Sequence, residues 1–298
     1  MRQSTPIYIV AATICALVIA VLVGCGTIPD MPEEPDRTKP TTMLLTVSYI
    51  DVGKGDCILV EAAGKSVLID TGYENTSDDV LSYLHGRGVN QLQCVIITHY
   101  DRDHIGGLRA IAEALPIEEV WLPNYESTDK NCRSVTDAIS SLNLSARQAT
   151  EEAAFQLGDA TLTIVPTSLT YEKKPGDSEG NDNDLSLVVT LTNREDSYLF
   201  AGDLEKKGIA AYLDDARGTF DVLKMPHHGE WCGKTDDLVE DVSPSLAIIT
   251  DGDDDPAEKK TLGCLEDAGV DTYRTSTDGT IVVESHGLGD YTVMTERS

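Results

Sequence analysis

The chain has 298 residues, of which 41% are hydrophobic and 5% aromatic, enough for one large globular domain or two small ones. Its formal net charge at pH 7 is −28, from 23 Lys and Arg against 51 Asp and Glu. Binding nucleic acid through its phosphates needs clustered Lys and Arg, and the sequence has no basic run. The composition therefore argues against a polyanion-binding surface, and the excess acid indicates a solvated surface that repels itself.

The N-terminus is predicted to be a targeting segment. Residues 7–23 are uncharged and almost wholly apolar, which suits a secretory signal or a short membrane span. Leu22, Val23, Gly24 and Cys25 resemble the lipobox of bacterial lipoproteins, in which the signal is cut before the cysteine and its thiol is lipidated. We expect residues 1–24 to be a lipoprotein signal peptide, with an uncleaved membrane anchor as the alternative. Either reading predicts an extracytoplasmic protein held on the cell membrane, by lipid on Cys25 or by an N-terminal helix.

Residues 25–42 are predicted to form a Pro-rich tether, because they carry four prolines, several charges and few apolar side chains. Residues 43–298 are then expected to form one folded domain. Its cysteines contain no C-x-x-C pair, and an exported chain could join them in two disulfides with one thiol left free. They are Cys57, Cys94, Cys132, Cys232 and Cys264.

Short β-rich runs alternate with helical patterns, which predicts an α/β fold. In the first half we expect strands at 43–51, 57–62, 66–72 and 92–98, and helices at 77–87 and 105–115. In the second half we expect strands at 160–165, 185–192, 197–201, 219–224, 245–250, 271–274, 279–284 and 290–295, and helices at 203–215 and 256–268. Asp255 is the expected N-cap of the last helix, ahead of Pro256.

The stretch T-H-Y-D-R-D-H-I-G-G, residues 98–107, ends a buried strand and enters a helix. In an extended loop, residues two positions apart point to the same side, so His99, Asp101 and Asp103 are expected to converge, with His104 directly after them. Imidazole and carboxylate together suit a divalent ion such as zinc, manganese or iron. The motif therefore predicts a metal site.

Two further strand ends carry donors of the same kind. Asp203 follows the strand at 197–201, and His227 and His228 follow the strand at 219–224. Ligands of layered α/β folds collect at the carboxyl ends of strands. We therefore expect all these side chains to meet.

Five stretches, in this order, resemble the metallo-β-lactamase superfamily, and within it the branch that contains the extracellular domain of the competence protein ComEC. They are DVGKGDCILVEAAGKSVLIDTG, THYDRDHIGGL, NDLSLVVTL, YLFAGDLE and LKMPHHGE, and the resemblance spans about residues 44–250. It implies a four-layer αβ/βα sandwich, in which two mixed β-sheets are flanked by helices and carry a two-metal site along one edge.

The resemblance also implies roles for single residues. His99 and Asp101 would bind one ion, Asp103 and His104 the other, and Asp203 would bridge them. Either His227 or His228 would complete the second ion's ligands, and Asp70 would hold a ligand imidazole in place. Many members supply a further histidine to the first ion, but this chain has none between His104 and Asp203. Water, Asn183 or Ser186 would take that place.

Two divalent ions, zinc first with manganese or iron as alternatives, would suit hydrolysis of a phosphoester or phosphodiester by a hydroxide held between them. Asp103, His227 and His228 are the expected catalytic residues. The histidine that is not a ligand could protonate the leaving group, as could water.

The expected substrate is a small phosphoester, or nucleic acid if Lys54, Lys224 and Lys234 make the cleft locally basic. A hydrolase of a non-phosphate ester or amide, and an exported binding module without catalysis, are the alternatives. The sequence indicates no protein partner.

Overall fold

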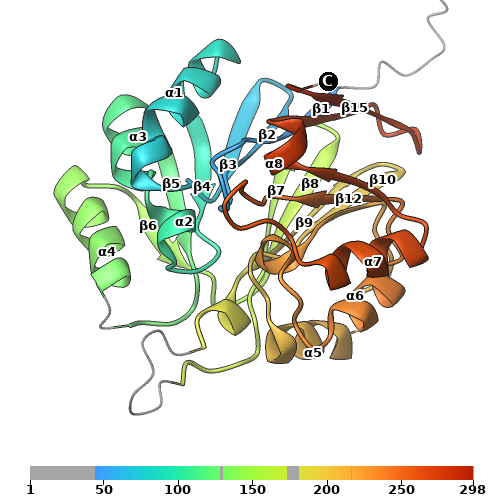
Figure 1. Ribbon diagram of the computed structural model, residues 1–298. Helices are drawn as coiled ribbons and strands as arrows, with labels where there is room; N and C mark the ends of the chain where they lie inside the picture. Colours follow the sequence, from blue (N-terminus) through green and yellow to red (C-terminus); the bar gives the residue numbers. More distant parts are fainter. Residues whose placement is uncertain (1–43, 128–129, 173–180, 216, 298) are drawn as a thin grey trace, which may run out of the picture. The chain divides into compact units, whose positions relative to one another are not determined.

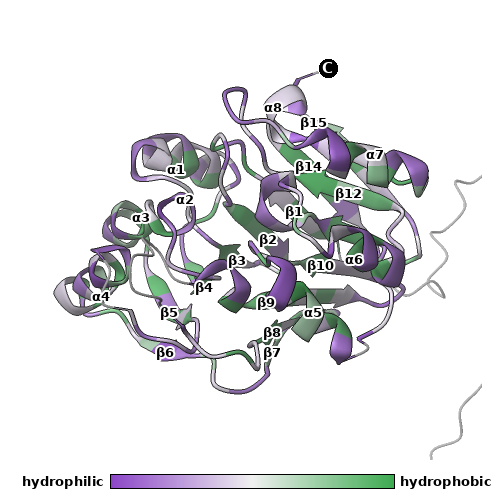
Figure 2. Cartoon of the chain, turned by 60° about the horizontal axis from the view of Figure 1, so that its bottom comes forward, coloured by the Kyte–Doolittle hydropathy of each residue, from purple (hydrophilic) through white to green (hydrophobic). Residues whose placement is uncertain are grey.

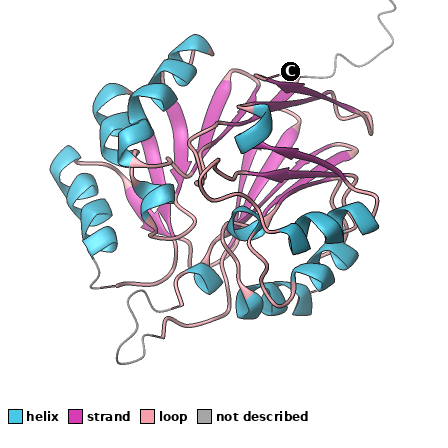
Figure 3. Ribbon diagram, viewed as in Figure 1, coloured by secondary structure: helices cyan, strands magenta, loops and turns pink. Residues whose placement is uncertain are grey.

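Two mixed β-sheets face each other, and each carries helices on its outer face (Figures 1 and 3). The computed structural model describes residues 44–127, 130–172, 181–215 and 217–297. The expected signal peptide (1–24), the tether (25–42) and Cys25 lie outside the described residues. Thr41–Ser298 form one compact unit. In the part of the chain that is described, no helix has the length and apolar character needed to cross a membrane.

The first sheet has eight strands in the order β15-β14-β1-β2-β3-β4-β5-β6, of which β3 to β6 run parallel. Its strands are β1 (Leu45–Tyr49), β2 (Ile58–Ala62), β3 (Lys65–Ile69), β4 (Leu92–Ile96), β5 (Ile117–Leu122), β6 (Ala146–Gln148), β14 (Ile281–Ser285) and β15 (Tyr291–Thr295).

The second sheet has seven strands in the order β13-β12-β11-β10-β9-β8-β7, of which β10 to β13 run parallel. Its strands are β7 (Ala153–Leu157), β8 (Ala160–Val165), β9 (Val188–Asn193), β10 (Asp196–Phe200), β11 (Val222–Lys224), β12 (Leu246–Ile249) and β13 (Asp271–Arg274).

Helices cover the outer face of each sheet. The first sheet carries α1 (Ser77–Gly86), α2 (Arg102–Ile105), α3 (Leu108–Ala114) and α4 (Lys130–Leu142), and the second carries α5 (Lys206–Asp214), α6 (Thr235–Val242) and α7 (Lys259–Asp267) (Figure 1). A short helix, α8 (Thr275–Asp278), follows β13. The four-layer αβ/βα sandwich expected from the sequence is confirmed.

The alternation of side chains along each strand creates these layers. On β10, Tyr198 and Phe200 lie in the core between the sheets, whereas Leu199 packs under the outer helices. On β3, Val67 and Ile69 face the second sheet and Leu68 faces the helices. Strands apolar on both faces are typical of sheets covered on both sides. Figure 2 shows hydrophobic residues along central strands such as β1, β2 and β14, and mixed colours along the helices.

The expected helix at 105–115 is divided into α2 and α3, and the two glycines of the motif lie between these helices. A Cβ on Gly106 would lie 2.3 Å from the Glu74 nitrogen, and one on Gly107 would lie 2.3 Å from the Thr71 oxygen. Neither distance is possible for a side-chain carbon, so only glycine lets this segment pass so close to the 71–74 loop. The two glycines thus allow the metal motif to pack directly on that loop.

Other expectations were wrong. Asp255 does not cap α7, which begins at Lys259; its carboxylate accepts a hydrogen bond from Lys54 Nζ at 2.7 Å instead. The five cysteines of the domain are all free thiols, so neither of the two possible disulfides is formed. The sequence analysis also assigned no element to β5, β6, β7, α4 or α6.

Candidate metal centre

The expected donors are brought together where parallel strands end. His99 follows β4, Asp203 follows β10, and His228 follows β11. Neighbouring parallel strands end at the same edge of a sheet, and the two sheets bring their edges together here. Residues far apart in the chain therefore share one buried site.

Four donor atoms lie within 4.8 Å of one another, from Asp103, His104, Asp203 and His228. Asp203 Oδ2 lies 3.2 Å from His104 Nε2 and 3.0 Å from His228 Nε2. His228 Nε2 lies 3.4 Å from Asp103 Oδ2 and 3.3 Å from His104 Nε2. Two ligands of a tetrahedral zinc ion, each about 2.0–2.1 Å from the metal, lie roughly 3.3 Å apart. The cluster therefore has the spacing that one such ion needs.

A second group of donors lies beside the first. His99 Nε2 is 3.7 Å from Asp101 Oδ2 and 3.9 Å from Asp203 Oδ2. The same oxygen of Asp203 thus lies between the His99 side and the His104–His228 side, as a bridging ligand would. His99 Nε2 is also buried without a hydrogen-bond partner, which is costly for a polar atom unless something binds it.

Hydrogen bonds to the far side of each imidazole fix the ligand nitrogen. Thr98 Oγ1 donates to Asp70 Oδ2 at 2.7 Å, so it can only accept from His99 Nδ1, 3.0 Å away. His104 Nδ1 donates to Asp70 Oδ2 at 2.8 Å. Asp70 is therefore where the sequence analysis expected it, behind a ligand imidazole.

The third imidazole is held in the same way. Thr250 Oγ1 donates to Asp56 Oδ1 at 2.6 Å and therefore accepts from His228 Nδ1 at 3.2 Å. His99, His104 and His228 all keep their proton on Nδ1 and present Nε2 toward the carboxylates. This shared tautomer is the one that lets Nε2 bind a cation, so the donor set fits a metal site.

Strained backbone occurs at the same positions. Asp70 has φ 57°, and His227, His228 and Gly229 form three consecutive left-handed residues with φ 49°, 52° and 83°. Such conformations cost on the order of 1–3 kcal/mol each outside glycine and cluster at functional sites. Here they occur at the residue that supports the His104 imidazole from behind and in the turn that carries His228.

The charges of the cluster shift one another's protonation. Burial lowers the pKa of His228, but Asp203 and Asp103 outweigh it and raise that pKa to about 9. Burial likewise lowers the pKa of His104, and Asp203 and Asp70 raise it well above its usual range. Burial raises the pKa of Asp203, but His104 and His228 hold it well below its usual range. Without a metal ion, protons on the imidazoles balance the carboxylates, and a bound cation would displace them.

Three residues expected at the site lie beside the four-donor cluster. His227 is part-buried at its mouth, with Nδ1 3.7 Å from Glu205 Oε1 and 3.8 Å from Glu230 Oε2. The Asn183 amide lies 3.4 Å from His227 Nε2 and donates to Glu205. Ser186 Oγ accepts from the Asp203 backbone nitrogen at 3.1 Å, so it holds the loop that carries the Asp203 carboxylate.

Three residues that support the candidate ligands were not predicted from the sequence: Asp56, Thr98 and Thr250. Asp56 lies in the DVGKGDC stretch and Thr98 directly precedes the motif, so proximity to the motifs was the available signal. Thr250 follows β12 and carries no signal of its own. Its role becomes visible only when β12 pairs with β11.

The condition set for a nucleic-acid substrate, a cleft made locally basic by three lysines, is not met in the structure. Lys54 pairs with Glu230 and Asp255, and Lys234 pairs with Asp237. Lys224 is fully buried and pairs with Asp56. Each ammonium is thus neutralised by carboxylates, and the nearby side chains Glu205 and Glu230 leave the mouth acidic.

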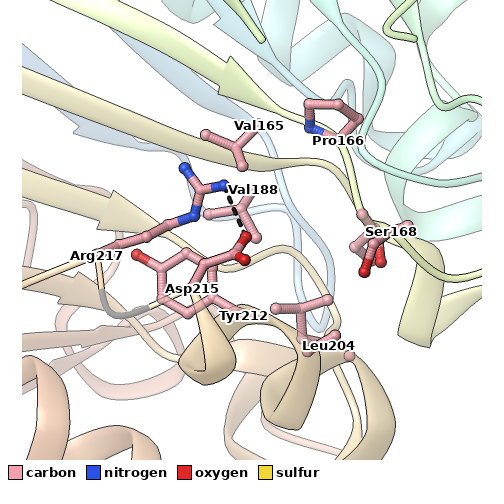
Figure 4. Close-up of a pocket in the computed structure, with 12 residues that line it drawn as sticks. Val165, Pro166, Ser168, Val188, Leu204, Tyr212, Asp215 and Arg217 are labelled. Atoms are coloured by element: carbon pink, nitrogen blue, oxygen red, sulfur yellow. Dashed lines mark hydrogen bonds and ion pairs between the residues drawn. The ribbon is translucent and has the colours of Figure 1, made fainter. Parts of the chain in front are cut away.

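A small pocket of about 20 Å³ lies between the end of β8 and helix α5 (Figure 4). Its wall includes Leu204 and Tyr212, and Arg217 pairs there with Asp215 at 2.9 Å. None of the candidate metal donors lines it, although Ser186 and Leu204, next to Asp203, are part of its wall. The candidate metal centre is therefore separate from this pocket.

Replacing Asp70 with asparagine is expected to weaken metal binding about 10–100-fold, as is typical when a ligand loses its outer partner. Asparagine tolerates the left-handed backbone, so the change removes the charge and one acceptor without strain. Titration of the chelator-treated protein with zinc measures the effect. Asp290→Asn, at an exposed position in the β14–β15 connection, is the control, and equal affinities for both variants would contradict the role given to Asp70.

Comparison with known proteins agrees with this arrangement. The profile of the metallo-β-lactamase superfamily matches residues 50–249, about two thirds of the chain and all of the donor positions. The chain belongs to the metallo-β-lactamase superfamily. Among solved structures, the metallo-β-lactamase fold protein YhfI of Bacillus subtilis superposes with a TM-score of 0.55 at 13% identity, covering 82% of this chain and 100% of that one. At such identity the likeness shows the fold alone.

Curated relatives place this superfamily member near the competence proteins. It is 24% identical over 257 residues to ComE operon protein 3 of Bacillus subtilis, covering 79% of this chain and 32% of the relative. It is 28% identical over 220 residues to Recombination protein 2 of Haemophilus influenzae, covering 72% of this chain and 25% of the relative. The chain thus spans about a third or less of these relatives, and they are the ComEC-like homologues that the sequence resemblance indicated.

Proposed function

We propose that this protein is a membrane-tethered, extracytoplasmic hydrolase with two divalent metal ions, which cleaves a phosphoester or phosphodiester. One observation carries the proposal: His99, His104 and His228 all present Nε2 toward Asp203 Oδ2, and hydrogen bonds behind each ring hold that orientation. Zinc is the first candidate, with manganese or iron as alternatives, because the donors are imidazole and carboxylate.

Two such ions, when bound, would activate a water molecule and stabilise charge on the phosphoryl oxygens. The chain's own residues would do the rest. Asp103, His104 and His228 would hold one ion, His99 and Asp101 the other, and Asp203 would join them. His227 faces the mouth, and an imidazole there can give a proton from its ring nitrogen to a leaving oxygen.

The paired lysines favour a small substrate over a nucleic acid. A long polyanion would meet Glu205 and Glu230 at the mouth and find no unpaired ammonium among Lys54, Lys224 and Lys234. The net charge of −28 adds repulsion at longer range. The names of the relatives, a competence protein and a recombination protein among them, keep nucleic acid as the second candidate.

The proposed anchor rests on the sequence Leu22–Val23–Gly24–Cys25 after an apolar segment. A lipid on Cys25 would hold the domain at the membrane surface through the Pro-rich tether. Incorporation of labelled palmitate into the wild-type chain, and its loss in Cys25→Ser, is the expected result. Equal labelling of the two would refute the anchor and leave the hydrolase proposal standing.

A substrate panel tests the activity. The full chain, purified in detergent and loaded with zinc, manganese or iron, is given an activated phosphomonoester, bis(p-nitrophenyl) phosphate, plasmid DNA and a cephalosporin. We expect turnover of the small esters that exceeds DNA cleavage and disappears with a chelator. Preferential DNA cleavage would establish the second candidate, and a protein that binds metal but turns over none of the four would favour a binding module.

A further inference from the structure

A lysine lies buried beneath the candidate metal centre. Lys224 is the last residue of β11, and its side chain is completely shielded from solvent. Its Nζ donates to the Gly202 carbonyl oxygen at 3.1 Å, pairs with Asp56 Oδ2, and lies 3.5 Å from Asp203 Oδ1. The ammonium is thus hydrogen-bonded to one carbonyl oxygen and lies between two carboxylates.

The contacts distinguish the two oxygens of the bridging carboxylate. Oδ2 of Asp203 faces His104 Nε2 and His228 Nε2 at 3.2 and 3.0 Å. Oδ1 faces Lys224 and has no hydrogen bond of standard geometry. The lysine therefore lies on the side of Asp203 opposite the imidazoles. It does not contact Oδ2, the oxygen that would bind metal.

Asp56 connects the lysine to the first sheet. It precedes β2, and its backbone nitrogen donates to the Asp103 carbonyl oxygen at 3.1 Å. Its Oδ1 accepts from Thr250, the residue that orients His228. Lys224 comes from the second sheet, so the Asp56–Lys224 pair joins both sheets directly under the centre.

The same lysine also supports the loop that carries His228. The Gly202 carbonyl oxygen accepts from Lys224 Nζ and, at 3.2 Å, from the His227 backbone nitrogen. Gly202 itself has φ 54°, and a Cβ there would lie 2.8 Å from Ser186 Cβ. Two donor-bearing loops are therefore fixed against one ammonium group.

A buried ion pair is weak evidence of stabilisation, since removing two charges from water costs as much as their attraction returns. A pair kept at this position therefore needs another reason, and its contacts supply one. We infer that Lys224 and Asp56 are positioning residues that hold Asp203 with Oδ2 turned toward the two ions. This inference rests on the proposed di-metal site.

The double variant Asp56→Asn, Lys224→Met removes both charges together, so no buried charge is left without a partner. We expect the full chain with both changes to fold, while its affinity for cobalt(II) falls about 10–100-fold and its stoichiometry falls from two ions toward one. The visible spectrum of bound cobalt should change as well, because the geometry around Asp203 changes. A merely structural pair would move neither the stoichiometry nor the spectrum.

The control is a part-buried ion pair, Asp251 with Arg274, at the ends of β12 and β13. Asp251→Asn, Arg274→Met is expected to keep two cobalt ions and the wild-type spectrum. Wild-type affinity, stoichiometry and spectrum in the Asp56–Lys224 double variant would overturn the inference. Failure of the wild-type chain to bind cobalt would instead refute the metal centre itself, so the two failures are distinct.

Should the double variant not fold, Asp56→Asn alone decides the question. It keeps Lys224 with the Gly202 oxygen and Asp203 as acceptors, so the lysine remains paired. A weaker affinity for cobalt and an altered spectrum are expected, because Lys224 and Thr250 both lose the charged partner that fixes them. An unchanged affinity and spectrum would overturn the inference.

Discussion

Asp203→Asn is expected to lower turnover of the small esters by more than about 100-fold and to reduce the bound metal from two ions to one or none, since losing a ligand costs more than losing its outer partner. The reason is that one oxygen, Oδ2, lies between the donors proposed for the two ions. An amide is neutral and cannot bridge two cations as a carboxylate does. Metal analysis and initial rates on the same preparation measure both effects.

The exposed residue Asp290 again supplies the control, since Asp290→Asn makes the same chemical change away from the centre. It is expected to keep both ions and full activity. If Asp203→Asn matched it in metal content and rate, the enzyme proposal would be wrong. Loss of turnover with both ions retained would instead mean that Asp203 acts on the substrate and not as the bridging ligand.

Removal of the metal is expected to reverse the pH dependence of stability. In chelator-treated protein, the raised pKa values of His104 and His228 contribute stability that is complete below the unfolded value of about 6.5. That stability is lost as pH rises through the folded value of about 9 for His228, which amounts to about 3 kcal/mol for this group. In metal-loaded protein the imidazoles carry no proton on Nε2, so metal affinity rises over the same interval.

Urea unfolding at pH 6.5 and at pH 9, with chelator and with saturating metal, measures this reversal. His286→Gln alters an exposed histidine and should leave this reversal unchanged. His228→Gln should reduce the loss of stability of the metal-free protein between pH 6.5 and 9, and also the gain in stability when metal is added. A metal-free wild-type protein that becomes more stable between pH 6.5 and 9 would contradict the assigned protonation. The lowered pKa of Asp203 acts at the acid end, where its contribution is lost as pH falls below about 4.

Much of the donor set could be predicted because its signal is concentrated. Residues 98–107 hold four donors within six positions, and two other motifs place donors at strand ends. The alternation of apolar runs likewise predicted most strands of both sheets. Hydrophobic periodicity and short motifs are local properties of a sequence, so they can be recognised without knowing which strands pair.

The supporting residues could not be predicted in this way. Lys224 was one of three lysines that could have made the cleft basic, because it lies near a motif. Its strand neighbours Phe200 and Ile248 instead place it in the core between the sheets. Thr250 supports His228 only because β12 pairs with β11. Such contacts depend on strand order, which the sequence pattern does not determine.

The missed elements have physical reasons as well. β6 (Ala146–Gln148) is an exposed edge strand of three residues without an apolar pattern. α4 buries only Cys132, Val135 and Ala138, and its exposed face is rich in Ser, Thr and charged residues. Both lie where the sheet meets solvent, so little hydrophobic periodicity is needed there.

The division of the donors between the two sheets has a consequence for folding. His99 and His104 belong to the first half of the chain, whereas Asp203 and His228 belong to the second, and neither half can collect the full set alone. A metal ion that bridges them would bind only after the halves have docked, and it would then resist their separation. The cation would therefore stabilise the tertiary structure at a late step of folding. Without it, the two sheets would separate most readily along this edge.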